Sequence, residues 1–349
     1  DSDTKMNELE GIENTDINEP KNILFDDKAD IDDLINSVLT SKSEITIFTS
    51  GTTGQPKKVV HTIGTLTRST RISFKYHSQI WAFAFNPTHM AGLQVFFQAF
   101  ANKNALINVF NKNRVEVYEL LSEYHVTHIS ATPTFYRLLL PVEKSYPEVC
   151  RVTLGGEKSN TKLYESMLLI FPNARINNIY ASTEAGSLFA AKGDLFQIPV
   201  ELKDKIKVED EELLIHNSLL GKSDSFSCVG DYYHSGDLIE WMDSDKGLFR
   251  FKSRKNELIN VGGYKINPGE VESVIMQFDG VQQAFVYGKP NSVLGNILCA
   301  EIKIEEGCSL SELDIRHWLA DKLQEFKIPR KIKFVENIAL TRTGKLKRT

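Results

Sequence analysis

Residues 49–58 read TSGTTGQPKK and directly follow the β-prone run EITIF. Glycines free backbone N–H groups to point at one centre, Ser and Thr hydroxyls add donors, and lysine adds a compact positive charge. This combination suits a bound phosphate. The stretch is not a Walker A loop, which ends in Gly-Lys-Ser/Thr. A plain connecting loop has the same composition, so both interpretations stay open at this point.

Four further stretches carry residue types that can do chemistry. They are LGGEKS (154–159), IYASTEAG (179–186), YHSGDLIEW (233–241) and SRKNELINVGGYKINPGEVE (253–272). Taken singly, each has a structural explanation: Gly155–Gly156 as a turn, Glu184 as a solvated carboxylate, Asp237 as a turn cap. In the same way, Lys345 near the C-terminus is an ordinary surface lysine when it is considered alone.

Composition and charge narrow the class of protein. The 349 residues suffice for two domains or one large one, and 41% hydrophobic and 25% charged residues are ordinary values. A net charge of −5 gives no support for nucleic acid or an anionic membrane as a partner. No apolar run approaches the ~20 residues of a membrane span. The four cysteines lack a C-x-x-C pair, and the N-terminus lacks a signal-peptide pattern, which predicts a cytoplasmic protein with reduced thiols.

The elements that must position these residues alternate between strand and helix. Strands are predicted at 44–48, 127–132, 151–156 and 175–181, and helices at 65–77, 113–125, 134–140 and 161–171. Such alternation predicts a largely parallel α/β sheet, in which ligands lie at the carboxyl ends of the strands. The loop at 49–58 follows the carboxyl end of its strand, and this favours the phosphate interpretation. Residues 1–35 are polar and predicted to be partly disordered or peripheral.

The pattern of predicted secondary structure changes after about residue 195. Short strands at 212–217, 236–242 and 247–251 predict an antiparallel region, and a small α+β unit follows from about residue 254. In that unit, Ser309 and Glu312 are expected to form a capping box before a helix at 313–326. One side of this helix is expected to face a core, through Leu313, Ile315, Trp318, Leu319 and Leu323. The predicted fold class is α/β, with a large N-terminal domain containing a β-rich region and a small mobile C-terminal α+β domain.

Together, and in this order, the five stretches closely resemble the adenylate-forming (AMP-binding) superfamily. That family includes acyl- and aryl-CoA ligases, luciferase and the adenylation domains of peptide synthetases. The resemblance covers about residues 44–349 and implies an N-terminal AMP-binding domain at 1–253, a hinge at 254–257 and a lid domain at 258–349. Most members have a longer region before the phosphate loop, so the resemblance implies a short N-terminal subdomain.

The resemblance also implies a set of nucleotide-binding residues. The loop around the ATP phosphates would consist of Thr49, Ser50, Gly51, Thr52, Thr53, Gly54 and Lys57. The adenine side would consist of Gly155, Gly156, Glu157, Tyr180, Ala181 and Ser182. Thr183 would contact phosphate, Glu184 would hold Mg²⁺, Asp237 would accept both ribose hydroxyls, Arg254 would also reach the ribose, and Lys345 would be the catalytic lysine. The chain departs from the family at Lys58 and Ala181, where Gly is common.

These residue types suit the implied reaction. A carboxylate oxygen attacks the α-phosphate of ATP, pyrophosphate leaves, and the acyl-adenylate then meets a second nucleophile. Because charge spreads over the phosphoryl oxygens in the transition state, the protein supplies mainly position and positive charge. By the resemblance, catalysis would rest on Lys345, Thr183 and Glu184 with ATP and Mg²⁺.

The second half-reaction in this family follows a rotation of the C-terminal unit. The pivot falls on Asn256, where Asp or Lys is usual, and Asn tolerates a changed φ/ψ. The rotation would withdraw Lys345 and bring in a pantetheine tunnel formed by Gly262, Gly263, Tyr264 and Lys265. The two glycines leave room for a narrow arm beside the backbone.

The acid substrate would be met by the stretch NPTHMAGLQ at 86–94, where the acyl-pocket residues are His89 and Gly92. Amino-acid-activating members carry an Asp in this region, and this chain has none nearby. Since an unpaired buried ammonium is costly, an aryl or acyl acid is favoured over an α-amino acid. His89 is alternatively a packed core histidine, and Phe85, Phe96 and Phe97 are equally suited to a pocket or a core.

Several acceptors stay open, and coenzyme A is favoured over the phosphopantetheine of a carrier protein or an amine. An acidic acyl carrier protein would need a docking surface, for which the basic stretch KIPRKIKF at 327–334 is suited, although charge runs are often only solvated. A catalytically idle adenylate- or carrier-binding module is a further alternative. It is disfavoured because Lys345, Glu184 and Asp237 occur together.

Overall fold

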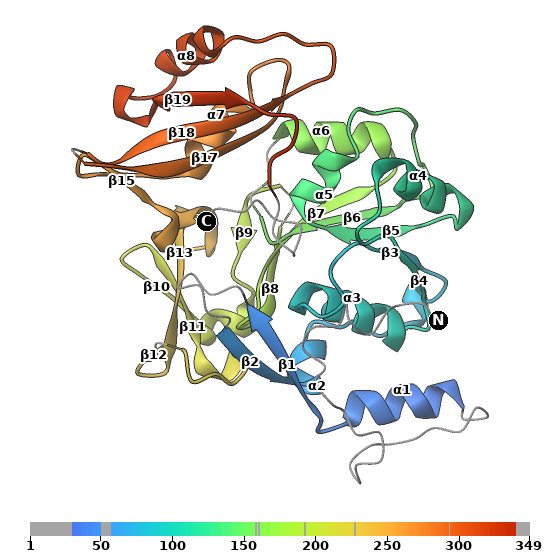
Figure 1. The fold of residues 1–349 in the computed structure, drawn as a ribbon. Helices are drawn as coiled ribbons and strands as arrows, with labels where there is room; N and C mark the ends of the chain where they lie inside the picture. Colours follow the sequence, from blue (N-terminus) through green and yellow to red (C-terminus); the bar gives the residue numbers. More distant parts are fainter. Residues whose placement is uncertain are drawn as a thin grey trace.

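The computed structural model describes residues 30–49, 57–157, 159, 161–191, 193–226, 228–292 and 294–339, and of Thr49 the backbone alone. Figure 1 shows three parts: a parallel sheet with helices, an antiparallel sheet beside it, and a small α+β unit above both. The predicted fold class is therefore confirmed. Residues 31–35 form the first turns of helix α1 (Ile31–Thr40), whose N-terminus is capped by Asp30.

The parallel sheet carries most of the stretches singled out above. Its strands, in spatial order, are β4 (Ala105–Asn108), β3 (Ile80–Phe83), β5 (His128–Ala131), β6 (Arg151–Gly155) and β7 (Arg175–Ser182), with β8 (Gly186–Ala191) antiparallel at the edge. Their apolar runs are buried against α4 (Arg114–Glu123), α5 (Pro133–Leu138) and α6 (Thr161–Ile170). Helix α3 (Met90–Ala101) packs on Trp81 of β3 through Val95 and Ala99. Strands buried on both faces need such continuous apolar sequence.

The strand before the phosphate loop does not join this sheet. β1 (Glu44–Thr49) pairs antiparallel with β2 (Lys57–Thr62), opposing Glu44 to Thr62 and Thr49 to Lys57. The inference that the 49–58 loop lies at the carboxyl end of a parallel strand is therefore wrong, and the loop connects a hairpin. The link between β1 and β2 is too short for a parallel connection, which needs about a dozen residues or more. The two strands therefore pair antiparallel, as a hairpin.

The helix predicted at 65–77 is also wrong for most of its length. α2 (Ile63–Thr67) ends early, and a single 3-10 turn, η2 (Phe74–Tyr76), follows. Between them the backbone is held by side chains of α3 and its C-cap: Arg71 N donates to Gln98 Oε1 (2.9 Å), and Asn102 Nδ2 donates to Arg71 O (2.9 Å). These bonds to a neighbouring helix replace the local bonds that a longer α2 would have made.

The antiparallel region has a sheet in the order β10 (Ile206–Glu209), β11 (Glu212–His216), β13 (Tyr232–Asp243), β14 (Leu248–Arg254) and β9 (Phe196–Gln197), and β12 (Cys228–Val229) also pairs with β13. Short 3-10 helices, η3 (Val200–Lys205) and η4 (Asn217–Leu219), connect its strands. Its core is rich in aromatic rings around Phe249, which is fully buried. The predicted antiparallel arrangement after residue 195 is confirmed.

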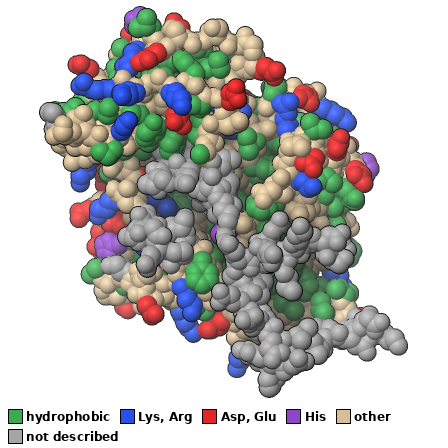
Figure 2. Space-filling view, in the orientation of Figure 1, with side chains coloured by type: hydrophobic (Ala, Val, Ile, Leu, Met, Phe, Trp, Pro, Cys, Tyr) green, Lys and Arg blue, Asp and Glu red, His purple; other side chains and the backbone are tan. Residues whose placement is uncertain are grey.

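The small unit begins after the 3-10 turn η5 (Lys255–Glu257). It contains the hairpin β15 (Ile259–Val261) and β16 (Tyr264–Ile266), helix α7 (Pro268–Ile275), the sheet of β17 (Val281–Asn291), β18 (Gly295–Ile304) and β19 (Lys331–Phe334), helix α8 (Glu312–Ala320) and the turn η6 (Glu325–Lys327). Figure 2 shows Lys and Arg side chains gathered on this unit, at the top of the view.

Helix α8 is capped two residues later than predicted, at Ser311. The capping box joins Ser311 and Asp314, with Asp314 N donating to Ser311 Oγ (3.2 Å), and the expected Ser309–Glu312 box is wrong. The helix also ends at Ala320, before the predicted end at 326. Leu313 is 63% exposed and not in the core as predicted, whereas Ile315 and Leu319 are fully buried.

His128 in β5 gives a pH test of this core. Its ring packs on Trp81 with 4.9 Å between centroids, and burial lowers its pKa from 6.5 to about 4. The unfolded chain therefore binds a proton at a higher pH than the folded chain, so stability is present above pH 6.5 and is lost as the pH falls toward 4. The loss between pH 7 and pH 5 amounts to about 2 kcal/mol.

We expect His128→Phe, which keeps the aromatic packing but cannot titrate, to remove that loss. Free energies of unfolding from urea titrations at pH 7 and pH 5 provide the measurement. The gap between the two values should shrink by about 2 kcal/mol in the variant relative to the parent protein. Parallel pH profiles of the two proteins would show that His128 titrates normally in the fold.

Candidate active site

A buried carboxylate lies where the parallel and antiparallel sheets meet. Asp237 of β13 is 5% exposed, and its Oδ2 accepts a hydrogen bond from the Tyr180 hydroxyl of β7 (2.6 Å). Its Oδ1 accepts from Arg254 Nε at 2.7 Å. The pairing of β13 with β14 sets Asp237 directly opposite Arg254, so strand register places the ion pair. Each carboxylate oxygen keeps a second lone pair for another donor.

The charges of this cluster are mutually stabilised. Attraction by Asp237 holds the pKa of Arg254 above its usual range. Burial, and after it the negative charge of Asp237, raises the pKa of Tyr180, whose hydroxyl therefore remains a donor. The Tyr180 ring stacks on Phe251 with 4.4 Å between centroids. About half of the Arg254 side chain stays exposed, although its Nε is engaged by Asp237.

A second buried carboxylate, which the sequence did not reveal, supports the first. Glu212 of β11 is 4% exposed and accepts hydrogen bonds from Gly236 N (2.9 Å) and Lys255 Nζ (3.0 Å). His234 Nδ1 lies 3.1 Å from Glu212 Oε2, the oxygen that also accepts from Lys255. Although burial opposes ionisation, these hydrogen bonds lower the pKa of Glu212. Glu212 thus fixes the backbone of Gly236, just before Asp237, and the side chain of Lys255, just after Arg254. These partners lie far from Glu212 in the chain, so no local sequence motif predicts them.

The predicted adenine-side residues follow β6 and β7 at the carboxyl end of the parallel sheet. Gly155 pairs with Ile179 at the end of β6, and Gly156 has a φ of +80°, which favours glycine. Glu157 Oε2 accepts from Thr134 N (3.0 Å) and Thr134 Oγ1 (2.7 Å), so this carboxylate closes the N-terminal turn of α5. Ala181 and Ser182 end β7, where Ser182 Oγ accepts from Ala185 N at 3.1 Å.

The turn that follows β7 carries Thr183 and Glu184, both half-buried. Among the described residues, no three His, Cys, Asp or Glu side chains gather as a metal-ligand cluster. Magnesium, however, needs only one or two protein carboxylates when substrate phosphates and water complete its shell. A single glutamate at this turn is therefore a donor set that fits a metal arriving with a nucleotide.

The predicted acyl-pocket residues lie at the start of α3, which follows β3 at the same edge of the sheet. His89 is the N-cap residue of α3. Gly92 has a packing role, since a Cβ there would lie 2.1 Å from Asn86 O. The helix also reaches β8, where Ser187 Oγ donates to Gln94 Oε1 at 2.9 Å. This contact places the first turns of α3 beside the strand that leaves the Thr183–Glu184 turn.

Other predicted residues lie elsewhere. Lys57 is the first residue of β2, opposite Thr49. Ser50, Gly51, Thr52, Thr53, Gly54 and Lys345 fall outside the described residues. Asn256 is the middle residue of η5.

The position of the Gly262–Lys265 hairpin is set by contacts within the small unit. Gly262 N donates to Leu294 O (2.8 Å), and Tyr264 stacks on Phe326 with 4.3 Å between centroids. Gly262 and Gly263 both have positive φ angles, of +58° and +91°. Figure 1 shows β15 at the end of the small unit remote from α6.

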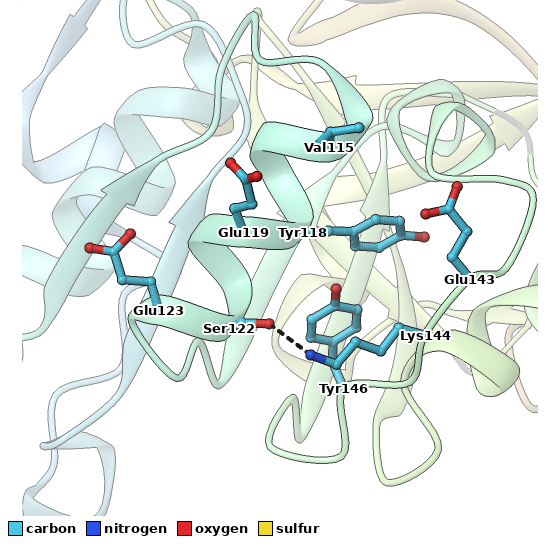
Figure 3. Close-up of a pocket in the computed structure, with 8 residues that line it drawn as sticks. All are labelled: Val115, Tyr118, Glu119, Ser122, Glu123, Glu143, Lys144 and Tyr146. Atoms are coloured by element: carbon cyan, nitrogen blue, oxygen red, sulfur yellow. Dashed lines mark hydrogen bonds between the residues drawn. The ribbon is translucent and has the colours of Figure 1, made fainter.

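A separate surface groove of about 650 Å³ lies between α4 and residues 143–146, and Figure 3 shows its lining. The rings of Tyr118 and Tyr146 stack there with 5.2 Å between centroids. None of the predicted site residues lines this groove. In the described parts of the chain, no helix is long and apolar enough to cross a membrane.

The chain matches two known protein-family models and several known proteins. The family model described as AMP-binding enzyme matches residues 16–212, and that of the AMP-binding enzyme C-terminal domain matches residues 270–345. A 2-succinylbenzoate–CoA ligase of Listeria monocytogenes is 26% identical over 344 residues, which is 88% of this chain and 69% of that protein. Gramicidin S synthase 2 of Brevibacillus brevis is 25% identical over 348 residues, 86% of this chain and 8% of that protein.

Solved structures show the same fold. The o-succinylbenzoate CoA synthetase of Bacillus subtilis, in complex with its acyl-adenylate intermediate, superposes with a TM-score of 0.67 at 22% identity. The match covers 86% of this chain and 67% of that chain. The chain thus spans about two thirds of the length of the CoA ligases that it matches.

The buried carboxylate of Glu212 gives a stability test of this site. We expect Glu212→Gln to cost about 1–3 kcal/mol at pH 7, because Lys255 and His234 lose a charged partner. Since hydrogen bonding lowers the pKa of Glu212, its contribution is present above the unfolded pKa near 4.3 and is lost as the pH falls through the folded value.

Glu209→Gln is the matched control, because Glu209 lies directly opposite Glu212 in the sheet but is exposed. Urea unfolding at pH 7 should separate the two variants by more than the error of the method. Equal and small losses of stability in both variants would show that Glu212 does not stabilise the site.

Proposed function

Because this chain belongs to the family of AMP-binding enzymes, we propose that it uses ATP to activate an aryl or acyl carboxylic acid and passes the acyl group to a thiol. The observation that carries the proposal is the cluster of Tyr180, Asp237 and Arg254 at the sheet junction. The Thr183–Glu184 turn follows β7, which also supplies Tyr180. A ribose site and a phosphate site would thus lie on neighbouring residues of one strand end.

The nucleotide would be held along this edge. Asp237 retains a free lone pair on each oxygen and would accept the two ribose hydroxyls, with Arg254 beside them. The adenine would lie against Gly155, Gly156 and the β7 end. The loop of Ser50, Gly51, Thr52, Thr53 and Gly54, with Lys57 behind it, would hold the phosphates. Lys345 would supply the mobile positive charge.

The reaction would proceed in two balanced steps. A carboxylate oxygen attacks the α-phosphorus of ATP, and the bond from that phosphorus to the bridging oxygen of pyrophosphate breaks. A thiolate then attacks the acyl carbon of the mixed anhydride, and AMP leaves with its new oxygen. In the first step Thr183, Glu184 and Lys345 act by position and electrostatics, since phosphoryl transfer asks little covalent chemistry of the protein.

The divalent ion of ATP would be Mg²⁺, which neutralises charge on the phosphates. Glu184 is the residue of this chain that would hold it, as the single carboxylate of the turn. The carboxylates of Asp237 and Glu212 are already committed to Arg254 and Lys255. Glu157 likewise closes α5.

The acid is proposed to be aryl or acyl, not an α-amino acid. Residues 83–101, which precede and form α3, contain no Asp or Glu to pair with an ammonium. The CoA ligase of Listeria monocytogenes named above is called a 2-succinylbenzoate ligase, which supports an aryl acid. His89 at the N-cap of α3 is the polar residue proposed to face the acid.

The small unit is proposed to rotate between the two steps. The proposed boundaries are residues 1–253 for the AMP-binding domain, 254–257 for the hinge and 258–349 for the lid. In the present orientation the small unit meets α6 through Lys162 Nζ and Glu305 Oε1, 3.4 Å apart and both half-exposed. Such an exposed pair contributes little and does not oppose rotation. Rotation about Asn256 would bring Gly262 and Gly263 to the site.

The proposed acceptor is coenzyme A, and the second candidate is the phosphopantetheine of a carrier protein. The Gramicidin S synthase 2 match favours the second candidate. So do the exposed basic residues Arg330, just before β19, and Lys331 and Lys333 within it. An amine acceptor and an idle adenylate-binding module are the remaining alternatives.

The test is pyrophosphate release from ATP across a panel of aryl, acyl and amino acids, followed by each acceptor in turn. Release with an aryl or acyl acid, and turnover of free coenzyme A, is the expected result. Acylation of a carrier protein without turnover of coenzyme A would instead assign the carrier. In that case, reversing the charges of Arg330 and Lys331 should weaken the reaction, more at low salt than at high salt. If no acid leads to pyrophosphate release, the catalytically idle adenylate-binding module becomes the favoured alternative.

The metal proposal predicts the behaviour of Glu184→Gln. The variant keeps the shape of the side chain but loses its charge, so the Mg²⁺ concentration for half-maximal pyrophosphate release should rise roughly tenfold or more. Glu165→Gln on the exposed face of α6 is the matched control and should leave it unchanged. An unchanged Mg²⁺ dependence in Glu184→Gln would give Glu184 a structural role only.

A further inference from the structure

Three consecutive backbone carbonyls of the turn after β7 are each held by a different part of the chain. His61 Nε2 lies 2.7 Å from Thr183 O, and Gly221 N donates to Glu184 O at 2.8 Å. Arg68 donates through Nη2 to Ala185 O and through Nη1 to Leu219 O at 2.9 Å. Residues 183–185 therefore cannot turn about their peptide planes without breaking bonds to three elements.

His61 is the most constrained of these donors. It belongs to β2 and is 2% exposed. Its Nδ1 lies 3.1 Å from Thr65 Oγ1. A Cβ on Gly221 would lie 2.6 Å from its Cε1, so only glycine lets this backbone lie on the imidazole ring. The ring has one position available to it.

The protonation of His61 follows from these contacts. Burial lowers its pKa, so the ring is neutral at pH 7. A carbonyl oxygen only accepts, hence the proton must lie on Nε2 and donate to Thr183 O. Nδ1 is then the acceptor nitrogen, and it shares the single proton of the Thr65 hydroxyl with Thr62 O, to which that hydroxyl donates at 2.9 Å. The imidazole is thus a fixed donor and has no spare proton for chemistry.

The strand that carries His61 is the strand that leaves the proposed phosphate loop. β2 begins at Lys57, and four residues later His61 bonds the Thr183–Glu184 turn. Val60 of the same strand exchanges two backbone bonds of 2.8 Å with Lys222, next to Gly221. The hairpin, the 219–222 segment and the turn are therefore joined into one frame by bonds that do not involve any ligand.

We propose that His61, with Arg68, is a positioning residue that holds the Thr183–Glu184 turn in a fixed orientation against β2. This inference rests on the proposed function, since a fixed orientation of the turn serves the reaction only if Thr183 and Glu184 meet ATP and its metal ion. With all three carbonyls turned into the protein, the side chains of Thr183 and Glu184 keep one direction relative to β2. Preorganisation of this kind matters because a displaced charge stabilises a phosphoryl-transfer transition state less well.

The test compares His61→Leu, which loses the donor, with His61→Gln, whose side-chain amide can still donate to Thr183 O. Ile47→Ala is the matched control, because Ile47 is buried in the paired strand β1 and packs in the core with Leu66 and Phe97, so its loss lowers stability while the bonds to the turn stay. Three readouts are taken: the thermal midpoint, the Mg²⁺ concentration for half-maximal pyrophosphate release, and amide hydrogen exchange of a peptide covering residues 183–187.

We expect His61→Leu to raise the Mg²⁺ requirement about three- to tenfold and to speed exchange in 183–187, with His61→Gln close to the parent protein. Ile47→Ala should lower the midpoint without either effect. If His61→Leu behaves like Ile47→Ala, the residue is structural and the proposal is overturned. If the parent protein releases no pyrophosphate with any acid, the proposed function fails, and the exchange data alone decide whether His61 fixes the turn.

Discussion

The rest of the structure depends on the burial of one carboxylate, Asp237, between a tyrosine and an arginine. A buried charge is tolerated only when it is paired and hydrogen-bonded, so Tyr180 and Arg254 must both be in place. Tyr180 ends the parallel sheet, and Arg254 ends the last strand of the antiparallel sheet. The cluster therefore joins the two sheets, and the chain leaves for the small unit directly from the ion pair.

This junction explains why a nucleotide site and a hinge would lie side by side. Arg254 faces Asp237, Lys255 is held by Glu212, and the next residue, Asn256, is the proposed pivot. The residues before the pivot are thus tied to the large part by two ion pairs. A rotation of the small unit would begin after these bonds and would leave the ribose contacts unchanged, so one nucleotide could serve both half-reactions.

Much of this arrangement could be predicted from the sequence, because parallel strands align their carboxyl ends. The stretches after β6 and β7 were recognisable as short apolar runs followed by glycine, threonine and glutamate, and the structure places them at neighbouring strand ends. The Asp237–Arg254 contact follows from a hairpin register that the spacing of the two residues allows.

The parts that could not be predicted depend on contacts between distant segments. Glu212 and His61 carry no local signal, because their partners lie in other strands or loops, and a lone Glu or His in a strand is more often structural. The helix predicted at 65–77 failed because Gln98 of α3 and Asn102 at its C-cap bond its backbone. The prediction that β1 joins the parallel sheet was wrong because β1 pairs with β2 instead. Strand propensity does not indicate which strand a given strand pairs with.

The central claim is that a carboxylate oxygen attacks the α-phosphorus of ATP in this site. The most direct measurement is mass spectrometry of the AMP formed from an acid labelled with ¹⁸O in both carboxylate oxygens, in the presence of the thiol acceptor. The account predicts AMP that carries one heavy oxygen and a thioester that keeps the other. Unlabelled AMP, or formation of ADP and phosphate in place of AMP and pyrophosphate, would contradict it.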